Sequence, residues 1–358
     1  MAMKVLIAMS GGVDSSVAAK ILRDQGHECV GATMRLYDNE DIGISKSKTC
    51  CSLDDVYDAR SVAFRLGIPY HVFNFTDGFK ENVIDKFVDC YLCGRTPNPC
   101  VDCNRYMKFG QLLARAEILG CDKIATGHYV RNTFENGRFV LRKAVDPTKD
   151  QSYVLYFLDQ RLLSKLLFPL GEMTKTETRD IAEKNGFINA AKKDSQDICF
   201  VPDGKYAEAI KRFSGKVPLS GDYLDVSGKV IGKHKGIIYY TLGQHKGLNL
   251  CSDDKLFVIA IDPVNNTVTL GKEEYLFKTT CEVKDISFTA NNPPSYPFRC
   301  AAKVRYRQTE QPATVYECDD GFRIVFDEPQ RAITPGQIAV LYNGDEVIGG
   351  GVITENIY

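Results

Sequence analysis

Two cysteines near residue 100 have a spacing that is typical of thiol and metal chemistry. Cys100 and Cys103 form a C-x-x-C pair directly after Pro97-Asn98-Pro99. The prolines and the asparagine predict a fixed, exposed turn, which suits a loop that faces a substrate. We expect a helix just after the pair, and the N-terminus of a helix lowers the pKa of a nearby thiol. The pair is therefore a candidate nucleophile at neutral pH.

The other cysteines leave more than one interpretation open. The chain has 13 cysteines among 358 residues, and an odd number in a chain that we expect to be cytoplasmic argues against a disulfide scaffold. Cys199 lies far along the chain. Cys100 and Cys103 could be half of a zinc site, but the sequence shows no clear second half. The other C-x-x-C pair, Cys90 and Cys93, falls on an expected helix, where packing explains it.

A glycine-rich string joins the first expected strand to the first expected helix. It reads Ala8-Met9-Ser10-Gly11-Gly12-Val13-Asp14-Ser15-Ser16. The adjacent glycines let the backbone turn tightly and bring N–H groups close to an anion. The two serines add hydroxyl donors at the helix N-terminus, where the dipole attracts phosphate. Asp14 beside a phosphate site suits a bridging Mg2+. The string is not a Walker A loop, because the Gly-Lys-Ser/Thr ending is absent.

Strand and helix patterns alternate along the first 200 residues, and this alternation predicts a parallel sheet that helices cover on both faces. The expected strands are 4–9, 28–33, 70–74 and 123–126, and the expected helices are 15–25, 52–66, 82–92, 105–119, 175–185 and 206–213. Ligands bind beyond the carboxyl ends of the strands in such sheets. The glycine-rich string follows the first strand and therefore lies at that edge.

Local signals mark several element ends. Asn136-Gly137 between two strand-like runs predicts a β-hairpin. Ser52 is expected to cap the helix that follows it. Thr174 and Glu177 have the spacing of a capping box, which predicts a helix start at that point.

The pattern changes after Ser214. From there on the chain is rich in short alternating runs that are separated by turn signals such as Asn343-Gly344, which is typical of all-β structure. We predict an α/β catalytic domain over residues 1–213, a small β-rich domain over 214–278 and a β-barrel-like domain over 279–358.

The bulk charge gives no support for nucleic-acid binding, since the formal net charge is -1. A local excess of positive charge exists between residues 100 and 143, which contain eight Lys and Arg but only four Asp and Glu. No stretch approaches the roughly 18 uninterrupted apolar residues of a membrane span, and the first residues lack the features of a signal peptide. We therefore expect a cytoplasmic protein without membrane contact.

The string from Ser10 to Ser15 resembles the pyrophosphate loop of the ATP pyrophosphatases, which cleave ATP to AMP and pyrophosphate and adenylate a carbonyl oxygen of the substrate. Taken with other strings, it resembles the tRNA-specific 2-thiouridylase family nearly over the whole chain. The strings that carry this resemblance are 51–55 (CSLDD), 94–104 (GRTPNPCVDCN), 125–129 (ATGHY), 149–153 (KDQSY), 194–200 (DSQDICF), 241–244 (TLGQ), 303–307 (KVRYR) and 334–337 (TPGQ).

The resemblance implies a role for individual residues. The ATP site would consist of Ala8, Met9, Ser10, Gly11, Gly12, Val13, Asp14, Ser15, Met34 and Gly127. Asn98, Pro99 and Cys100 would meet the target base, and further tRNA contacts would come from His128, Lys149, Asp150, Gln151, Arg305, Tyr306 and Gln337. Cys103 would be the catalytic thiol, and Cys199 would carry the incoming sulfur as a persulfide. The implied cofactors are ATP and Mg2+, and the implied partners are tRNA and a persulfide-carrying donor protein.

Two positions depart from the family pattern. Many members have Asp where this chain has Cys100, and His245 replaces a usual Arg. Three thiolates, from Cys100, Cys103 and Cys199, could instead hold a 4Fe–4S cluster that delivers sulfide. Two further hypotheses stay open at this point. One is an amidase-type ligase with the same ATP chemistry, and the other is a non-catalytic tRNA-binding or redox protein.

Overall fold

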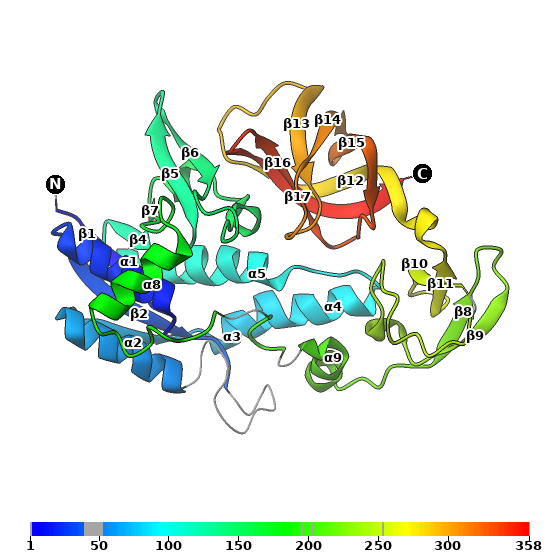
Figure 1. Ribbon diagram of the computed structural model, residues 1–358, viewed down its shortest axis with the longest axis horizontal. Helices are drawn as coiled ribbons and strands as arrows, with labels where there is room; N and C mark the ends of the chain where they lie inside the picture. Colours follow the sequence, from blue (N-terminus) through cyan, green and yellow to red (C-terminus); the bar gives the residue numbers. More distant parts are fainter. Residues whose placement is uncertain (1, 39–52, 195–196, 202–203, 253, 358) are drawn as a thin grey trace.

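The computed structural model describes residues 2–38, 53–194, 197–201, 204–252 and 254–357 (Figure 1). The N-terminal part is built on a five-stranded sheet in the order β3-β2-β1-β4-β7, in which all neighbours are parallel. Its strands are β1 (Lys4–Ala8), β2 (Glu28–Arg35), β3 (Tyr70–Asn74), β4 (Lys123–Ala125) and β7 (Leu166–Leu167). The predicted parallel sheet and its first four strands are confirmed.

The central strand β1 shows why the sheet is covered on both faces. Successive side chains of a strand point to opposite faces, and here both faces are apolar. Val5 and Ile7 pack with the helices α1 (Val13–Asp24), α2 (Leu53–Leu66) and α8 (Lys175–Lys184). Leu6 and Ala8 pack on the other face, against the long helical segments between residues 76 and 118.

Those helical segments begin earlier than the sequence predicts. The first runs through α3 (Thr76–Phe79), a π-helical stretch (Lys80–Asp85) and α4 (Lys86–Leu92). The second runs through α5 (Pro99–Asp102), a π-helical stretch (Cys103–Gln111) and α6 (Leu112–Ile118). The expected starts at residues 82 and 105 are therefore wrong. Pro99 occupies the first helical turn of α5, because its fixed φ suits that place and its missing N–H costs nothing there.

Two of the local signals are confirmed and the third falls outside the described residues. Thr174 and Glu177 form both hydrogen bonds of a capping box at the start of α8. The hairpin consists of β5 (Val130–Glu135) and β6 (Arg138–Lys143), and Asn136 and Gly137 both have positive φ, at 50° and 78°. Positive φ at both turn residues is what a two-residue hairpin requires. Ser52 lies outside the described residues.

The rest of the chain is largely β-structure after α7 (Gln160–Leu163) and α9 (Tyr206–Ser214). A four-stranded sheet has the order β10-β11-β8-β9. Its strands are β8 (Gly221–Leu224), β9 (Val230–His234), β10 (Phe257–Asp262) and β11 (Thr267–Gly271). The last six strands close into a barrel, because β12 pairs with both β15 and β17. They are β12 (Phe277–Phe288), β13 (Phe298–Lys303), β14 (Gln311–Cys318), β15 (Gly321–Arg331), β16 (Ile338–Asn343) and β17 (Glu346–Ile357).

The three parts are not independent of one another. Figure 1 shows the β5–β6 hairpin standing beside the barrel, and β6 pairs with β17 at Arg142 and Glu346. The buried hydroxyl of Tyr153 donates to the carbonyl of Ile338 at 2.7 Å. These contacts join the α/β part to the barrel. None of the helices in the described part of the chain is long and apolar enough to cross a membrane.

We expect Tyr153→Phe to weaken this junction. The Ile338 carbonyl would lose a donor in a dry interface, which costs about 1–2 kcal/mol, so the thermal unfolding midpoint should fall by several degrees. Tyr316→Phe is the matched control, because Tyr316 is 44% exposed on the barrel. Equal midpoints for the two variants would contradict the role of this hydrogen bond.

Candidate active site

A pocket of about 870 Å3 opens at the carboxyl edge of the parallel sheet. It is lined by the glycine-rich loop, the ends of β1 and β2, the first turns of the helix that begins at Pro99, the residues around His128, residues 192–194 and 197–200, and Tyr306 with Arg307 of the barrel. Cys100, Cys103 and Cys199 all line it. Segments far apart in the sequence thus bring three cysteines and a phosphate-type loop to one cavity.

Most residues that the sequence assigns to an ATP site lie on this pocket. Those that line it are Ala8, Met9, Ser10, Gly12, Val13, Asp14, Ser15, Met34 and Gly127. Gly11 does not line the pocket and lies against the backbone of Asp55. Its φ is +75°, and a Cβ there would lie 2.5 Å from the backbone oxygen of Asp55. Gly11 therefore shapes the loop.

Hydrogen bonds hold the loop in shape from within and from behind. The Ser10 N–H donates to the Ser15 hydroxyl at 3.1 Å. The side-chain amide of Asn189 donates to the Gly11 carbonyl and to the Ser16 hydroxyl, both at 2.9 Å. Asn189 is buried, and nothing in its sequence context marks it as a partner of the loop. Protein hydrogen bonds therefore fix the conformation of the loop.

Gly127 brings the end of β4 against the loop. A Cβ at Gly127 would lie 2.7 Å from the Ser15 nitrogen and 2.8 Å from the carbonyl carbon of Asp14. Only glycine permits so close an approach of two backbones. The next residue, His128, also lines the pocket.

Ion pairs connect the loop to residues that the sequence analysis missed. Asp14 accepts hydrogen bonds from the Tyr129 hydroxyl at 2.9 Å and from the buried Lys175 ammonium group at 2.7 Å. Lys175 also pairs with Asp194 at 2.7 Å. Its position in the first turn of α8 gave no functional signal, because the capping box already explained that string.

Asp194 forms ion pairs with several cations near the pocket. Lys149 reaches it at 2.7 Å and Arg179 at 3.2 Å, in addition to Lys175. Burial raises the pKa of Asp194, but the hydrogen bonds from Lys149 and Lys175 outweigh burial and hold that pKa below its usual range. Asp194 is therefore ionised at neutral pH. Lys149, predicted to touch tRNA, lines the pocket as a carboxylate-paired cation.

Both β parts hold the loop that precedes the cysteines. The Thr96 N–H donates to the Pro335 carbonyl at 2.9 Å. The Gln337 amide donates to the carbonyls of Thr96 and Pro97, at 2.8 and 3.1 Å. On the other side, a Cβ at Gly94 would lie 3.0 Å from the Ile261 side chain of β10. The barrel and the four-stranded sheet thus set where the cysteine helix begins.

Several residues predicted to touch tRNA serve internal contacts in the structure. The Arg305 guanidinium donates to the Ala332 carbonyl at 2.8 Å and to the Thr334 hydroxyl at 2.7 Å. Asp150 accepts from the Ser152 hydroxyl at 2.7 Å, and Gln151 accepts from the Tyr129 N–H at 2.9 Å. Arg305, Asp150, Gln337 and Asn98 do not line the pocket, whereas Pro99, Gln151 and Tyr306 do. Contact of any of these residues with tRNA stays a prediction.

His128 is nearly enclosed, with 6% of its surface exposed. Its Nδ1 lies 2.7 Å from the Thr126 hydroxyl, and its Nε2 lies 3.3 Å from the Lys108 ammonium group. Burial and the neighbouring Lys108 charge hold the His128 pKa well below its usual range. The ring is therefore neutral, and its Nε2 accepts a hydrogen bond from Lys108.

The three cysteines do not form a metal cluster as placed. Across the described ranges, no three His, Cys, Asp or Glu side chains are grouped closely enough to hold a metal ion. A 4Fe–4S cluster held by Cys100, Cys103 and Cys199 therefore stays a prediction.

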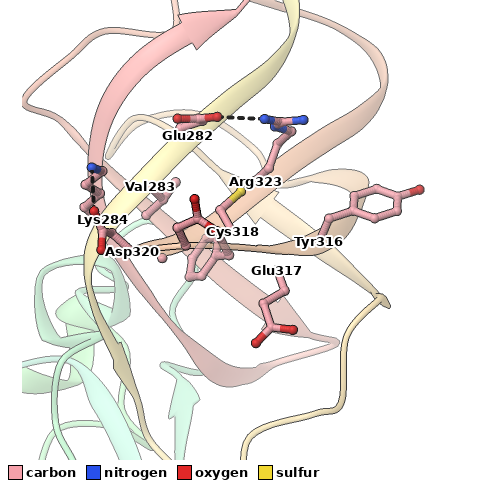
Figure 2. A pocket seen from close by; sticks show the side chains of 11 residues that line it. Glu282, Val283, Lys284, Tyr316, Glu317, Cys318, Asp320 and Arg323 are labelled. Carbon is pink, nitrogen blue, oxygen red and sulfur yellow. Dashed lines mark hydrogen bonds and ion pairs between the residues drawn. The ribbon is translucent and has the colours of Figure 1, made fainter.

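A second pocket, of about 350 Å3, lies on the barrel (Figure 2). Charged side chains border it and pair with one another. Glu282 pairs with Arg323 at 2.8 Å, and Lys284 pairs with Asp320 at 3.3 Å. It contains none of the predicted site residues, so the pocket at the sheet edge is the candidate active site.

The parallel sheet, the loop between β1 and α1 and the pocket at that edge define a nucleotide-binding domain of the ATP pyrophosphatase class. Residues 3–203 match the family model described as tRNA methyl transferase HUP domain. Residues 208–272 match the tRNA methyl transferase PRC-barrel domain, and residues 278–353 match the aminomethyltransferase beta-barrel domain.

Curated relatives resemble the chain over its full length. The tRNA-specific 2-thiouridylase of Clostridioides difficile is 47% identical over 357 residues, which cover 99% of each chain. That of Clostridium acetobutylicum is 49% identical over 355 residues, which cover 98% of this chain and 99% of the relative. The chain therefore belongs to the tRNA-specific 2-thiouridylase family, as its motifs predict.

Asp102, between the two cysteines, should make stability depend on pH. Burial raises its pKa to about 6, against opposing effects of Lys86 and Arg105, and Asp285 of β12 raises it further. The folded state thus keeps a proton that the unfolded state loses, so stability should fall as pH rises from about 4 to about 6. Asp102→Asn removes this cost. We expect it to raise the thermal midpoint more at pH 7.5 than at pH 4.5, and an equal shift at both values would contradict the raised pKa.

Proposed function

We propose that the protein is an ATP-dependent tRNA 2-thiouridylase, which adenylates the C2 oxygen of the wobble uridine and replaces it with sulfur. The observation that carries the proposal is one pocket lined by the phosphate-type loop and by Cys100, Cys103 and Cys199. The family membership supports the same activity, since the curated relatives carry that name.

The chemistry of the pocket favours thiolation over the methyl transfer that the family model's description names. A methyl group passes from a carrier to a nucleophilic atom and requires no phosphate loop. Replacement of a uracil oxygen requires that this oxygen become a leaving group and that a sulfur nucleophile stand beside it. The loop and the thiols are suited to those two requirements. An amidase-type ligase would use the loop but would leave the cysteines without a role.

In the first step, the uracil C2 oxygen would attack the α-phosphorus of ATP and pyrophosphate would leave. The loop N–H groups and the Ser10 and Ser15 hydroxyls are suited to bind the phosphates at the N-terminus of α1. Mg2+ would offset charge on the departing pyrophosphate. Asp14 suits that ion, because Tyr129 and Lys175 donate to its Oδ1 while no described residue donates to its Oδ2.

In the second step, sulfur would replace AMP at C2. A persulfide on Cys199 could add its terminal sulfur to C2, after which Cys103 would attack the Cys199 sulfur and free the thiouridine. Alternatively Cys103 would attack the Cys199 sulfur first and release sulfide, which then adds to C2. Both routes leave a Cys103–Cys199 disulfide. A donor protein must therefore reload Cys199, and an external dithiol must reduce the disulfide.

The direct test is mass analysis of tRNA nucleosides after incubation with ATP, Mg2+, a persulfide donor and a dithiol. Formation of 2-thiouridine at the wobble position, lost when ATP is omitted, is the expected result. Absence of thiolated nucleoside with an ATP-competent protein would overturn the proposal.

Asp14→Asn should separate nucleotide chemistry from RNA binding. Loss of the carboxylate removes the Mg2+ ligand and the partner of Lys175, so tRNA-dependent pyrophosphate release should fall by at least about 100-fold. Affinity for tRNA in a gel-shift assay should stay within about twofold, because we assign the loop to the phosphates of ATP and not to RNA. Equal loss of both properties would contradict the assignment of the loop to ATP.

Cys103→Ser and Cys199→Ser should each block thiolation but retain tRNA-dependent pyrophosphate release, because adenylation precedes sulfur transfer. Peptide mass analysis should find a persulfide on Cys199 after donor treatment. Cys100→Ser should retain measurable thiolation. Iron content and absorbance of anaerobically purified protein test the cluster alternative. About four irons per chain and a broad absorption band near ~400 nm, both lost in Cys100→Ser, would establish a cluster mechanism instead.

A further inference from the structure

Lys108 has a different kind of partner from two other lysines that line the pocket, Lys149 and Lys192. Lys149 pairs with Asp194, and Lys192 pairs with both Asp55 and Asp58. These carboxylates offset much of the lysine charge. The ammonium group of Lys108 instead lies 3.3 Å from the Nε2 of His128, and no carboxylate of a described residue lies within ion-pair distance of it. Lys108 therefore presents an undiminished positive charge to the pocket.

The helix geometry places Lys108 beside the cysteines. Residues 103–111 are π-helical, and such a helix bonds residue i to residue i+5. Cys103 and Lys108 are five residues apart, so they lie one turn apart on the same face, and both line the pocket. An ordinary α-helix would rotate Lys108 away from Cys103. Stretches of π-helix occur often at functional sites.

The partner of Lys108, His128, lies next to the phosphate-type loop. His128 directly follows Gly127, whose backbone lies against Ser15 and Asp14. The ring of His128 is fixed, because Thr126 contacts its Nδ1 at 2.7 Å and Phe109 and Phe168 pack within 6.3 Å of its centre. A neutral ring in a fixed place can hold an ammonium group without reducing its charge. Lys108 thus lines the same pocket as Cys103 and the phosphate-type loop, and its partner His128 directly follows the glycine that contacts this loop.

We propose that Lys108 is a catalytic residue of adenylation, whose ammonium group binds the α-phosphate of ATP, and that His128 is the residue that positions it. This inference rests on the proposed function. When the uracil oxygen bonds to the α-phosphorus and the bond to pyrophosphate breaks, negative charge spreads over the α-phosphate oxygens. A fixed cation beside those oxygens stabilises that charge. Lys108 contacts the same phosphate when it departs as part of AMP, so no proton transfer by Lys108 is required.

The test compares pyrophosphate release by wild type, Lys108→Met, Lys108→Arg and the remote control Lys20→Met, all with tRNA, ATP and Mg2+. Lys20 lies on α1 and pairs with Asp24. We expect Lys108→Met to lower the rate constant for pyrophosphate release by about 100- to 1,000-fold. The dissociation constants for ATP and tRNA should change less than about fivefold. Lys108→Arg should recover at least tenfold, and Lys20→Met should match wild type.

The two His128 variants test positioning. His128→Leu keeps the apolar contacts with Phe109 and Phe168 but removes the acceptor, and it should slow pyrophosphate release by about 10-fold or more. His128→Gln supplies an acceptor oxygen and should recover part of that loss. A merely structural role of His128 would make both variants equally slow and would lower their thermal midpoints.

Each outcome separates the inference from the proposed function. If wild type releases no pyrophosphate with tRNA, the proposed function fails. If wild type and Lys108→Met release it at similar rates, only the inference on Lys108 fails. Normal pyrophosphate release by Lys108→Met together with slow alkylation of Cys103 by iodoacetamide would also overturn it, since Lys108 would then serve the thiolate and not the phosphate.

Discussion

The contact between the barrel and the loop before α5 sets the geometry of the whole site. Gln337 donates to two successive carbonyls of that loop, and the Pro335 carbonyl accepts the Thr96 N–H in return. A surface loop of this length would otherwise be free to move, and α5 would have no defined start. Because the loop is held, Pro99 begins the helix at one place. Cys100 and Cys103 then line the same pocket as the phosphate-type loop.

This contact also gives the β parts a physical role that their position in the chain does not suggest. The barrel holds the cysteine loop through Gln337 and contributes Tyr306 and Arg307 to the pocket wall. The four-stranded sheet supports the same loop at Gly94. The candidate pocket is therefore lined by the α/β part and the barrel, and the four-stranded sheet lies beside the loop that precedes its cysteines. Its geometry depends on the docking of β structure that carries none of the three cysteines of the site.

Ion pairs offset much of the positive charge around the pocket. Asp14, Asp194, Asp55 and Asp58 pair with Lys149, Lys175 and Lys192, and these pairs connect elements that are distant in sequence. An anionic ligand would have to compete with carboxylates for those cations. Lys108 differs from these three lysines, because the neutral ring of His128 contacts its ammonium group without opposing its charge. The positive charge that an anionic ligand would meet in the pocket therefore depends on which lysines pair with a carboxylate.

The sequence by itself determined the elements whose signals are local. The parallel sheet follows from apolar runs, the capping box from Thr174 and Glu177, the hairpin from Asn136-Gly137, and the phosphate-type loop from its glycines and serines, because each depends on residues close together in the chain. The start of the second long helix at Pro99 escaped prediction, since the proline signals a turn as readily as a first helical residue. Lys175, Asp194, Asn189 and Lys108 also escaped it. Only the tertiary structure decided their roles, because an ion pair or a hydrogen bond between residues 15 or more positions apart depends on how the sheet, the helices and the barrel pack.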